Sequence, residues 1–378
     1  MNRCILHVGM PKTGSTSIQE SLYHGLRGRG FRYISFGEVN GERMVLTCFG
    51  KDRGETHHHH QKLGMTREEV ARLRASYFSR LEQVVERARR RGDTLVVSAE
   101  SAWTMSPEEF AGIRDYLGQR GYSVDVFVYL RSWKGWLESN FQERIKQGER
   151  SFEVLPAARR RCVDYAGQLA ALDVAFGPDH VFPAWFTPQA FPDRCVVLDF
   201  CRRAGIPLPP RHVRRVNDGI SVDALKLLLA HRRWNRGYGV GLRAVIRNEM
   251  LFRRLREVAG PPVRFHSSLV ESVRGVWLEQ IPFVERRVGS ALRDDVRRDD
   301  EGACLRHESQ LVEFSRPALD WLGQATGCRP VANTSGDAAA REVGEQVHRL
   351  LEHPSMASQW SWRRMILARR IGHWTRGV

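Results

Sequence analysis

The chain has 378 residues, 42% of them apolar and 27% charged, a composition typical of globular proteins with one large core or two modest ones. No uninterrupted apolar run approaches the ~20 residues of a membrane span, so we expect no membrane-spanning helix. Lysine and arginine outnumber aspartate and glutamate by 59 to 43, and this net charge of +16 favours anionic partners. Because no zinc-finger spacing, basic zipper or RNA-binding aromatic motif accompanies the charge, we do not expect a nucleic acid among those partners.

The seven cysteines are scattered along the chain without a CxxC pair. This pattern argues against a zinc ribbon or a disulfide framework and predicts a reducing compartment. The apolar run at 4–8 is too short for a signal peptide. We therefore expect a cytoplasmic protein without a metal site.

The first 206 residues alternate short, β-branched apolar segments with segments of helical pattern. The predicted strands cover 3–8, 31–36, 94–98, 123–130 and 180–185. The predicted helices cover 15–27, 66–91, 107–119, 132–148, 158–176 and 193–204. Apolar strands of this kind suit burial on both faces, so the alternation predicts a three-layer α/β fold with a central parallel sheet flanked by helices over 1–206.

The pattern changes after the Pro- and Arg-rich connector "GIPLPPRHVRR". A helix is predicted after an N-cap at Ser221, with further helices at 241–258 and 269–280, so we expect a mainly helical region over 207–330. A basic helical tail is expected over 331–378, where Trp360, Leu367, Ile371 and Trp374 recur at helical spacing between arginines. This tail either packs on the core or lies on an anionic membrane surface.

The segment "ILHVGMPKTGSTSIQESL" predicts a strand, a glycine-rich turn from Gly9 to Gly14 and a helix. Free N–H groups and the helix dipole make such a turn an anion cradle. In ATP-hydrolysing P-loops, GxxxxGK[ST], the lysine opens the helix and the next hydroxyl holds magnesium. Here Ser15 takes the place of that lysine and Lys12 lies inside the loop. The loop favours a 5′-phosphate with a less charged distal group and no metal, although an ordinary turn or another nucleotide binder would also fit.

The stretch "HVGMPKTGSTSIQ" resembles the 5′-phosphosulfate loop of sulfotransferases that use 3′-phosphoadenosine 5′-phosphosulfate (PAPS), in a form common among bacterial members. A second stretch, "VFVYLRSWKGWLESNFQERIKQG", supplies Arg131 at a strand end and Ser139 eight residues later. That family binds the 3′-phosphate with this pair. The resemblance covers 1–20 and 94–148, and it implies a P-loop-type fold with PAPS as donor and adenosine 3′,5′-bisphosphate (PAP) as product.

The resemblance also implies which residues hold the donor. The 5′-phosphate would be held by Pro11, Lys12, Thr13, Gly14, Ser15, Thr16 and Ser17. Arg131 would grip the 3′-phosphate through its planar guanidinium, with Ser139 donating from the side. The alternatives are a solvated arginine at a strand end and a neutral serine on a helix.

Two candidates compete for the general base. "TLVVSAESAWTM" places Glu100 directly after a predicted strand, and family members that act on glycans use a glutamate at a similar place. Glu100 could equally pair with an arginine or cap a helix. The rival is one of His57 to His60 in "ETHHHHQKLG", a segment expected to be a surface loop before a long helix. Four consecutive histidines do not have the spacing of a helical metal site.

With this resemblance, the sequence predicts in-line transfer of a sulfuryl group from PAPS to a hydroxyl or amine. Lys12 would stabilise charge on the leaving phosphate and Glu100 would accept the proton. The basic surface suits an anionic carbohydrate or glycolipid acceptor. The helical region 207–330 would complete the cleft that binds this acceptor. The basic-glycine motif with which cytosolic small-molecule sulfotransferases close over the nucleotide is absent, so Arg214, Arg215 or later arginines would have to replace it. A P-loop kinase and a non-catalytic protein that binds a polyanion or membrane surface remain as alternatives.

Overall fold

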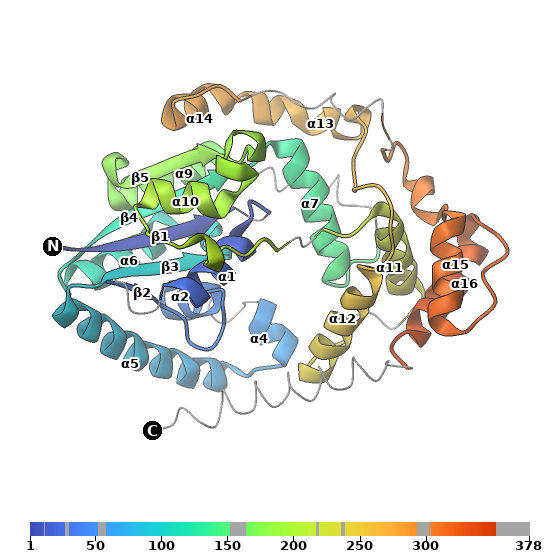
Figure 1. Ribbon diagram of the computed structural model, residues 1–378, viewed down its shortest axis with the longest axis horizontal. Helices are drawn as coiled ribbons and strands as arrows, with labels where there is room; N and C mark the ends of the chain where they lie inside the picture. The colour runs from blue at the N-terminus through green and yellow to red at the C-terminus, as the bar shows by residue number, and fades with distance from the viewer. Residues whose placement is uncertain are drawn as a thin grey trace. The chain divides into compact units, whose positions relative to one another are not determined.

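The computed structural model describes residues 1–10, 12–26, 30–51, 58–151, 164–216, 219–235, 239–292, 302 and 304–352 (Figure 1). The chain divides into two compact units. The first unit comprises Met1–Trp136, Arg161–Asn217 and Arg274–Asp294, and the second comprises Leu137–Arg160, Asp218–Val273 and Asp295–Val378. The boundaries expected at 206/207 and 330/331 stay predictions, and most of the tail, 353–378, lies outside the described residues.

A five-stranded parallel sheet forms the centre of the first unit. In the order β2-β3-β1-β4-β5, its strands are β2 (Phe31–Tyr33), β3 (Thr94–Ala99), β1 (Asn2–Gly9), β4 (Tyr122–Leu130) and β5 (Val181–Trp185). This arrangement confirms the predicted α/β fold with a central parallel sheet. β2 is shorter than expected because the chain turns away at Ser35, whose hydroxyl donates to the carbonyl of Glu38.

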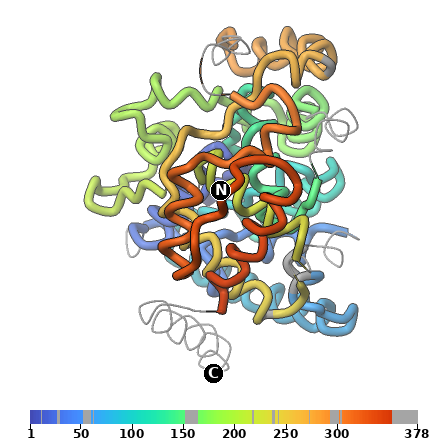
Figure 2. Tube along the Cα trace, turned by 90° about the vertical axis from the view of Figure 1, so that its right-hand side faces the viewer, coloured from blue at the N-terminus to red at the C-terminus, as the bar shows by residue number. Residues whose placement is uncertain are grey.

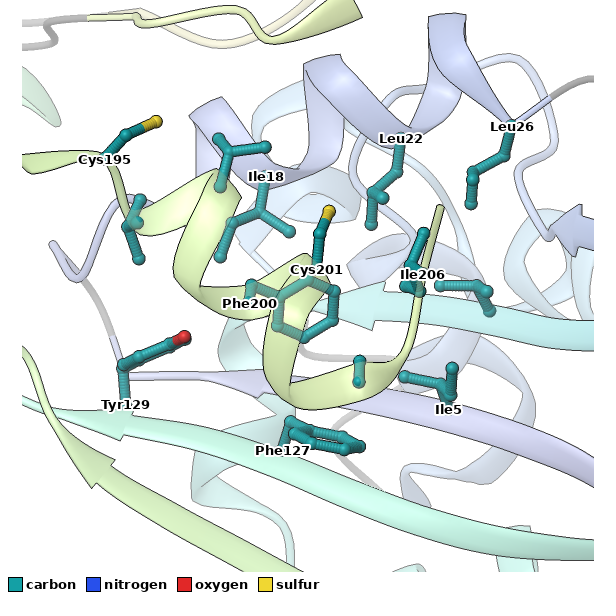
Figure 3. Close-up of a cluster of buried hydrophobic side chains, with 14 of the residues drawn as sticks. Ile5, Ile18, Leu22, Leu26, Phe127, Tyr129, Cys195, Phe200, Cys201 and Ile206 are labelled. Carbon is teal, nitrogen blue, oxygen red and sulfur yellow. The ribbon is translucent and has the colours of Figure 1, made fainter. Parts of the chain in front are cut away.

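Two helices, α1 (Ser15–Gly25) and α10 (Val196–Ala204), cover one face of this sheet. Figure 3 shows Ile18 and Leu22 of α1 facing Phe200 of α10, with Phe127 of β4 in the same cluster. These side chains are at most 2% exposed, so they form a dehydrated core directly beneath the start of α1. α10 begins three residues later than predicted because Asp193 and Arg194 adopt positive φ angles of 49° and 52°, which no α-helix accommodates.

The other layer of helices consists of α2 (Glu42–Phe49), α5 (Arg67–Arg91), α6 (Pro107–Gly118) and α9 (Tyr165–Phe176). α5 and α6 each begin with a capping box, at Thr66 and Ser106. The short helices α4 (His58–Leu63) and α14 (Ile281–Val288) also belong to the first unit. α14 is tied to α9, since Arg287 donates to both carboxylate oxygens of Asp173 at 2.8 and 2.7 Å.

The described part of the second unit is mainly helical, as expected for the region after the connector. Its helices are α11 (Val222–Trp234), α12 (Leu242–Leu255), α15 (Arg316–Thr326) and α16 (Gly336–Arg349), and it shares α7 (Trp133–Lys146) and α13 (Ser267–Leu278) with the first unit. Figures 1 and 2 show α15 and α16 side by side. α11 and α16 pack closely, and glycine at 344 permits this. A Cβ at Gly344 would lie only 2.8 Å from the carbonyl oxygen of Ala230.

In the part of the chain that the structure describes, short 3₁₀ turns connect these elements: η1 (Glu100–Thr104), η2 (Pro178–His180), η3 (Pro188–Ala190), η4 (Pro192–Arg194), η5 (Pro210–His212) and η6 (Glu308–Val312). Within the described residues, no helix combines the length and the apolar character that crossing a bilayer requires.

Candidate functional site

The candidate site lies at the carboxyl ends of the three central strands β3, β1 and β4, the edge at which open α/β sheets bind ligands. The loop after β1 leads into α1, η1 begins with Glu100 directly after β3, and Arg131 directly follows β4. Parallel pairing of the strands therefore brings together three segments that are distant in the sequence.

The loop between β1 and α1 has a left-handed backbone at two positions. Gly14 has a φ of 77°, and a Cβ there would lie 2.6 Å from Cγ1 of Val196, so only glycine fits. Lys12 has a φ of 70°, a conformation that is unfavourable for a residue with a side chain. The buried hydroxyl of Thr13 donates to the carbonyl of Met10 at 2.7 Å. Thr13 is thus engaged in holding the loop itself, and Pro11 lies outside the described residues.

The first turn of α1 has the properties of an anion cradle. No side chain caps the helix start and no acidic residue lies in its first turn. The hydroxyl of Ser15 is buried, would collide with a Cβ at Gly9, and has no hydrogen-bond partner in the described part of the chain. An unpaired buried hydroxyl beside the positive end of a helix dipole is a suitable donor to a bound anion. Thr16 is half-buried in the same turn.

Two charged side chains hold the backbone of Lys12 from opposite sides. The N–H of Lys12 donates to Oε1 of Glu100 at 3.3 Å, and Nη1 of Arg131 donates to the carbonyl of Lys12 at 2.9 Å. Arg131 is itself held by Tyr165, whose hydroxyl donates to its carbonyl at 2.8 Å. The structure therefore brings together Lys12, Glu100 and Arg131, which the sequence had singled out separately.

Ser139, the expected partner of Arg131, is only 7% exposed and lies in the second turn of α7. It belongs to the second unit, whereas Arg131 belongs to the first. Its role in binding a 3′-phosphate stays a prediction.

A second carboxylate, Glu42, lies at the same sheet edge, and the sequence analysis missed it. Glu42 opens α2, is 8% exposed, and accepts a hydrogen bond from the N–H of Ser101 at 3.3 Å. The preceding N–H, that of Gly41, donates to the carbonyl of Ser98 at 2.8 Å. The segment before α2 is thus attached to the end of β3 next to Glu100. No local pattern reveals this, because the attachment joins residues 59 positions apart.

The histidine segment differs from the expected surface loop. His58 to His60 begin the short helix α4, and His57 lies outside the described residues. His60 is 1% exposed and lies 3.4 Å from the hydroxyl of Thr47 through its Nε2. Because its imidazole lies against Thr47 of α2, His60 is a buried residue in this structure.

The arginines considered as a substitute for the basic-glycine motif have partners within the protein in this structure. Nη1 of Arg214 lies 3.7 Å from a carboxylate oxygen of Glu20, and Nη2 of Arg215 donates to the carbonyl of Asp193 at 2.7 Å. Their backbone nevertheless runs along α1: the N–H of Val216 donates to the hydroxyl of Ser17 at 3.0 Å. Ser17, expected to be a phosphate ligand, is therefore occupied by a backbone contact.

A buried polar pair lies on β1 and β3 within the sheet, before the carboxyl ends of these strands. His7 and Ser98 are register partners on β1 and β3, and Nδ1 of His7 lies 2.8 Å from the hydroxyl of Ser98. Burial of the imidazole lowers the pKa of His7 from 6.5 to about 3, so this histidine is neutral at physiological pH. In the residues that the structure describes, no three His, Cys, Asp or Glu side chains are grouped so as to share a metal ion.

Comparisons with known proteins add a distant similarity. The chain is 26% identical over 139 residues to an uncharacterized protein of Archaeoglobus fulgidus, a match that covers 36% of this chain and 37% of that protein. No family model matches the chain. No solved structure matches it either.

Proposed function

We propose that the protein is a sulfotransferase that moves a sulfuryl group from PAPS to a hydroxyl or amine, on a carbohydrate or glycolipid acceptor. The observation that carries the proposal is the double contact on Lys12, whose N–H meets Glu100 and whose carbonyl meets Arg131. These contacts bring together a lysine for charge stabilisation, a carboxylate for proton transfer and an arginine for phosphate binding, beside the first turn of α1. The sequence resemblance supports the same three roles.

The residues of the first unit fit the donor. The glycine at 14 lets the backbone approach a phosphate, and the unpaired hydroxyl of Ser15 offers a donor inside the loop. Thr16 and the N–H groups of the first turn of α1 would complete the 5′-phosphate site. A guanidinium has five N–H groups, so Arg131 can hold Lys12 and still present donors to the 3′-phosphate.

Each residue would have a defined task in the reaction. Bound PAPS supplies the sulfuryl group, whose bond to the phosphate oxygen breaks as the acceptor oxygen or nitrogen bonds to sulfur. Lys12 would balance the negative charge that remains on the phosphate. Glu100 would accept the proton of the acceptor, with Glu42 next to it as the rival carboxylate. Most of the rate enhancement would come from positioning and electrostatics, as in phosphoryl transfer.

The excess of positive charge suits an acceptor that carries anionic groups. We place the reaction in the cytoplasm, with contact to the inner membrane surface through the basic tail as a further proposal for lipid-linked acceptors. The two alternatives make different demands on the site. A kinase would require magnesium and tolerate loss of Arg131, and a non-catalytic polyanion binder would be indifferent to Glu100.

Calorimetric titration with PAP in the absence of metal, beside ATP with magnesium, tests the donor site. We expect micromolar, metal-free binding of PAP that Arg131→Ala abolishes. Preference for ATP with magnesium would instead support the kinase, and binding of neither nucleotide would leave the polyanion binder. Transfer of labelled sulfate from PAPS to candidate glycans then tests the reaction.

A further inference from the structure

We propose that Ser17 and Ser21 form a clip on α1 that positions residues 208–216 beside the donor loop, and that this clip sets the affinity for the donor. The inference rests on the proposed function and adds two positioning residues to it. It also replaces the expected role of Ser17 as a phosphate ligand.

Each serine of the clip contacts both backbone groups of one residue in the segment. The N–H of Arg214 donates to Oγ of Ser21 at 2.8 Å, and the N–H of Val216 donates to Oγ of Ser17 at 3.0 Å. In return, the hydroxyl of Ser17 points to the carbonyl of Val216 at 3.3 Å, whereas that of Ser21 donates to the carbonyl of Ser17 in its own helix at 2.7 Å and lies 3.3 Å from the carbonyl of Arg214. The helix therefore binds alternate residues of an extended segment, as a neighbouring strand would.

A third small residue extends the same helix face. Ser17, Ser21 and Gly25 are four residues apart, so they line one side of α1. A Cβ at Gly25 would lie 2.9 Å from Cβ of His212 and would collide with Leu208. The contacts Gly25 to His212, Ser21 to Arg214 and Ser17 to Val216 show that the segment runs antiparallel to α1, toward the donor loop.

The clip ends where the proposed 5′-phosphate binds. Val216 lies against the first turn of α1, and Arg214 and Arg215 precede it, so two positive charges are carried along this helix. Attraction between an arginine and a phosphate falls with distance and with solvent screening. Releasing the segment would let both arginines leave their positions beside α1 and would weaken binding without removing any group that touches the ligand.

Ser21→Ala separates the clip from direct binding, because Ser21 lies one turn away from the cradle. Val216→Pro is the second variant: it removes the N–H that Ser17 accepts and leaves the serine in place. Ser106→Ala, which removes the capping serine of α6 in the same unit, controls for a general loss of stability. PAP affinity is measured by calorimetry, and amide hydrogen exchange at Arg214 reports whether the segment is released.

We expect Ser21→Ala and Val216→Pro each to weaken PAP binding about tenfold, and Ser21→Ala to speed exchange at Arg214, with unchanged binding in Ser106→Ala. The clip is wrong if exchange at Arg214 speeds up while PAP affinity stays within about twofold of wild type. The clip is also wrong if Ser17→Ala weakens PAP binding while Ser21→Ala and Val216→Pro do not, because Ser17 would then be a direct ligand of the phosphate. Failure of the wild-type protein to bind PAP would refute the proposed function itself, and the clip with it.

Discussion

Two helices of the first unit begin in opposite ways, although both start at the edge of the same sheet. α6 satisfies its own first turn: the hydroxyl of Ser106 accepts from the N–H of Glu109, and the Glu109 carboxylate accepts from the N–H of Ser106 at 2.8 Å. α1 begins at Gly14 without a side-chain cap and without an acidic residue in its first turn. Unpaired N–H groups at a helix start need an acceptor. α6 therefore supplies its own acceptors, whereas the start of α1 leaves N–H groups that the proposed donor phosphate would accept from.

The largest expected effect comes from the cation inside the α1 loop. Lys12→Ala and Lys12→Gly should both lower the rate of sulfuryl transfer about 10²–10³-fold, since each removes the charge opposite the leaving phosphate. The two variants should differ in stability. Glycine relieves the left-handed backbone at φ 70°, so the free energy of unfolding should be ~1 kcal/mol higher in Lys12→Gly than in Lys12→Ala. Initial rates and thermal melts measure both, and a Lys12→Ala enzyme as active as wild type would contradict this reading.

The next effect separates the two carboxylates beside the loop. We expect Glu100→Gln to lower the rate about 10²-fold or more and to remove the acidic limb of its pH profile, because the base can no longer take up a proton. Glu42→Gln keeps an oxygen acceptor for the N–H of Ser101 and should change the rate less than about tenfold. If Glu42→Gln shows the greater loss, Glu42 and not Glu100 is the base.

Acid should lower the free energy of unfolding through His7, which lies on β1, the strand that leads into α1. Burial lowers the pKa of His7 from 6.5 to about 3, so below pH 6.5 the unfolded chain binds a proton that the folded chain does not. Stability is therefore full above pH 6.5 and is lost as the pH falls toward 3. His231 on α11, whose pKa burial also lowers to about 3, should act likewise in the second unit.

Each of these histidines should lower the free energy of unfolding by about 2 kcal/mol between pH 7 and pH 5. Denaturant titrations at both pH values measure the change. His7→Gln should reduce the pH dependence, and an unaltered dependence would show that the imidazole of His7 is not shielded from protons.

The smallest effect tests the two helix starts directly. Ser106→Ala should lower the free energy of unfolding by about 1 kcal/mol and leave PAP binding unchanged, because a cap is lost. Ser15→Ala should leave stability nearly unchanged, since its hydroxyl has no partner in the described residues, and should weaken PAP binding. Thermal melts and calorimetry on the same samples decide this, and equal behaviour of the two variants would remove the distinction between the helices.

Much of the first unit could be predicted because its signals are local. Every predicted strand of the sheet is present, and the short β-branched apolar runs located them within three residues. The end of β2 and the start of α10 were misplaced, since a serine turn ends the strand early and two left-handed residues delay the helix. His60 was expected at the surface. The structure buries it beside Thr47, which periodicity could not reveal in a run of four identical residues.

The sequence by itself determined the three-layer fold, the glycine-rich loop and the residues that end the central strands, because strand and helix periodicity and turn glycines act over a few residues. Tertiary structure alone decided that Glu100 and Arg131 contact the N–H and the carbonyl of Lys12, that Glu42 binds the N–H of Ser101 beside Glu100, and that Ser17 binds the backbone of Val216. These contacts join residues 59 to 199 positions apart. The order of the parallel strands sets the positions of Lys12, Glu100 and Arg131. The packing of 208–216 along α1 sets the contact between Ser17 and Val216.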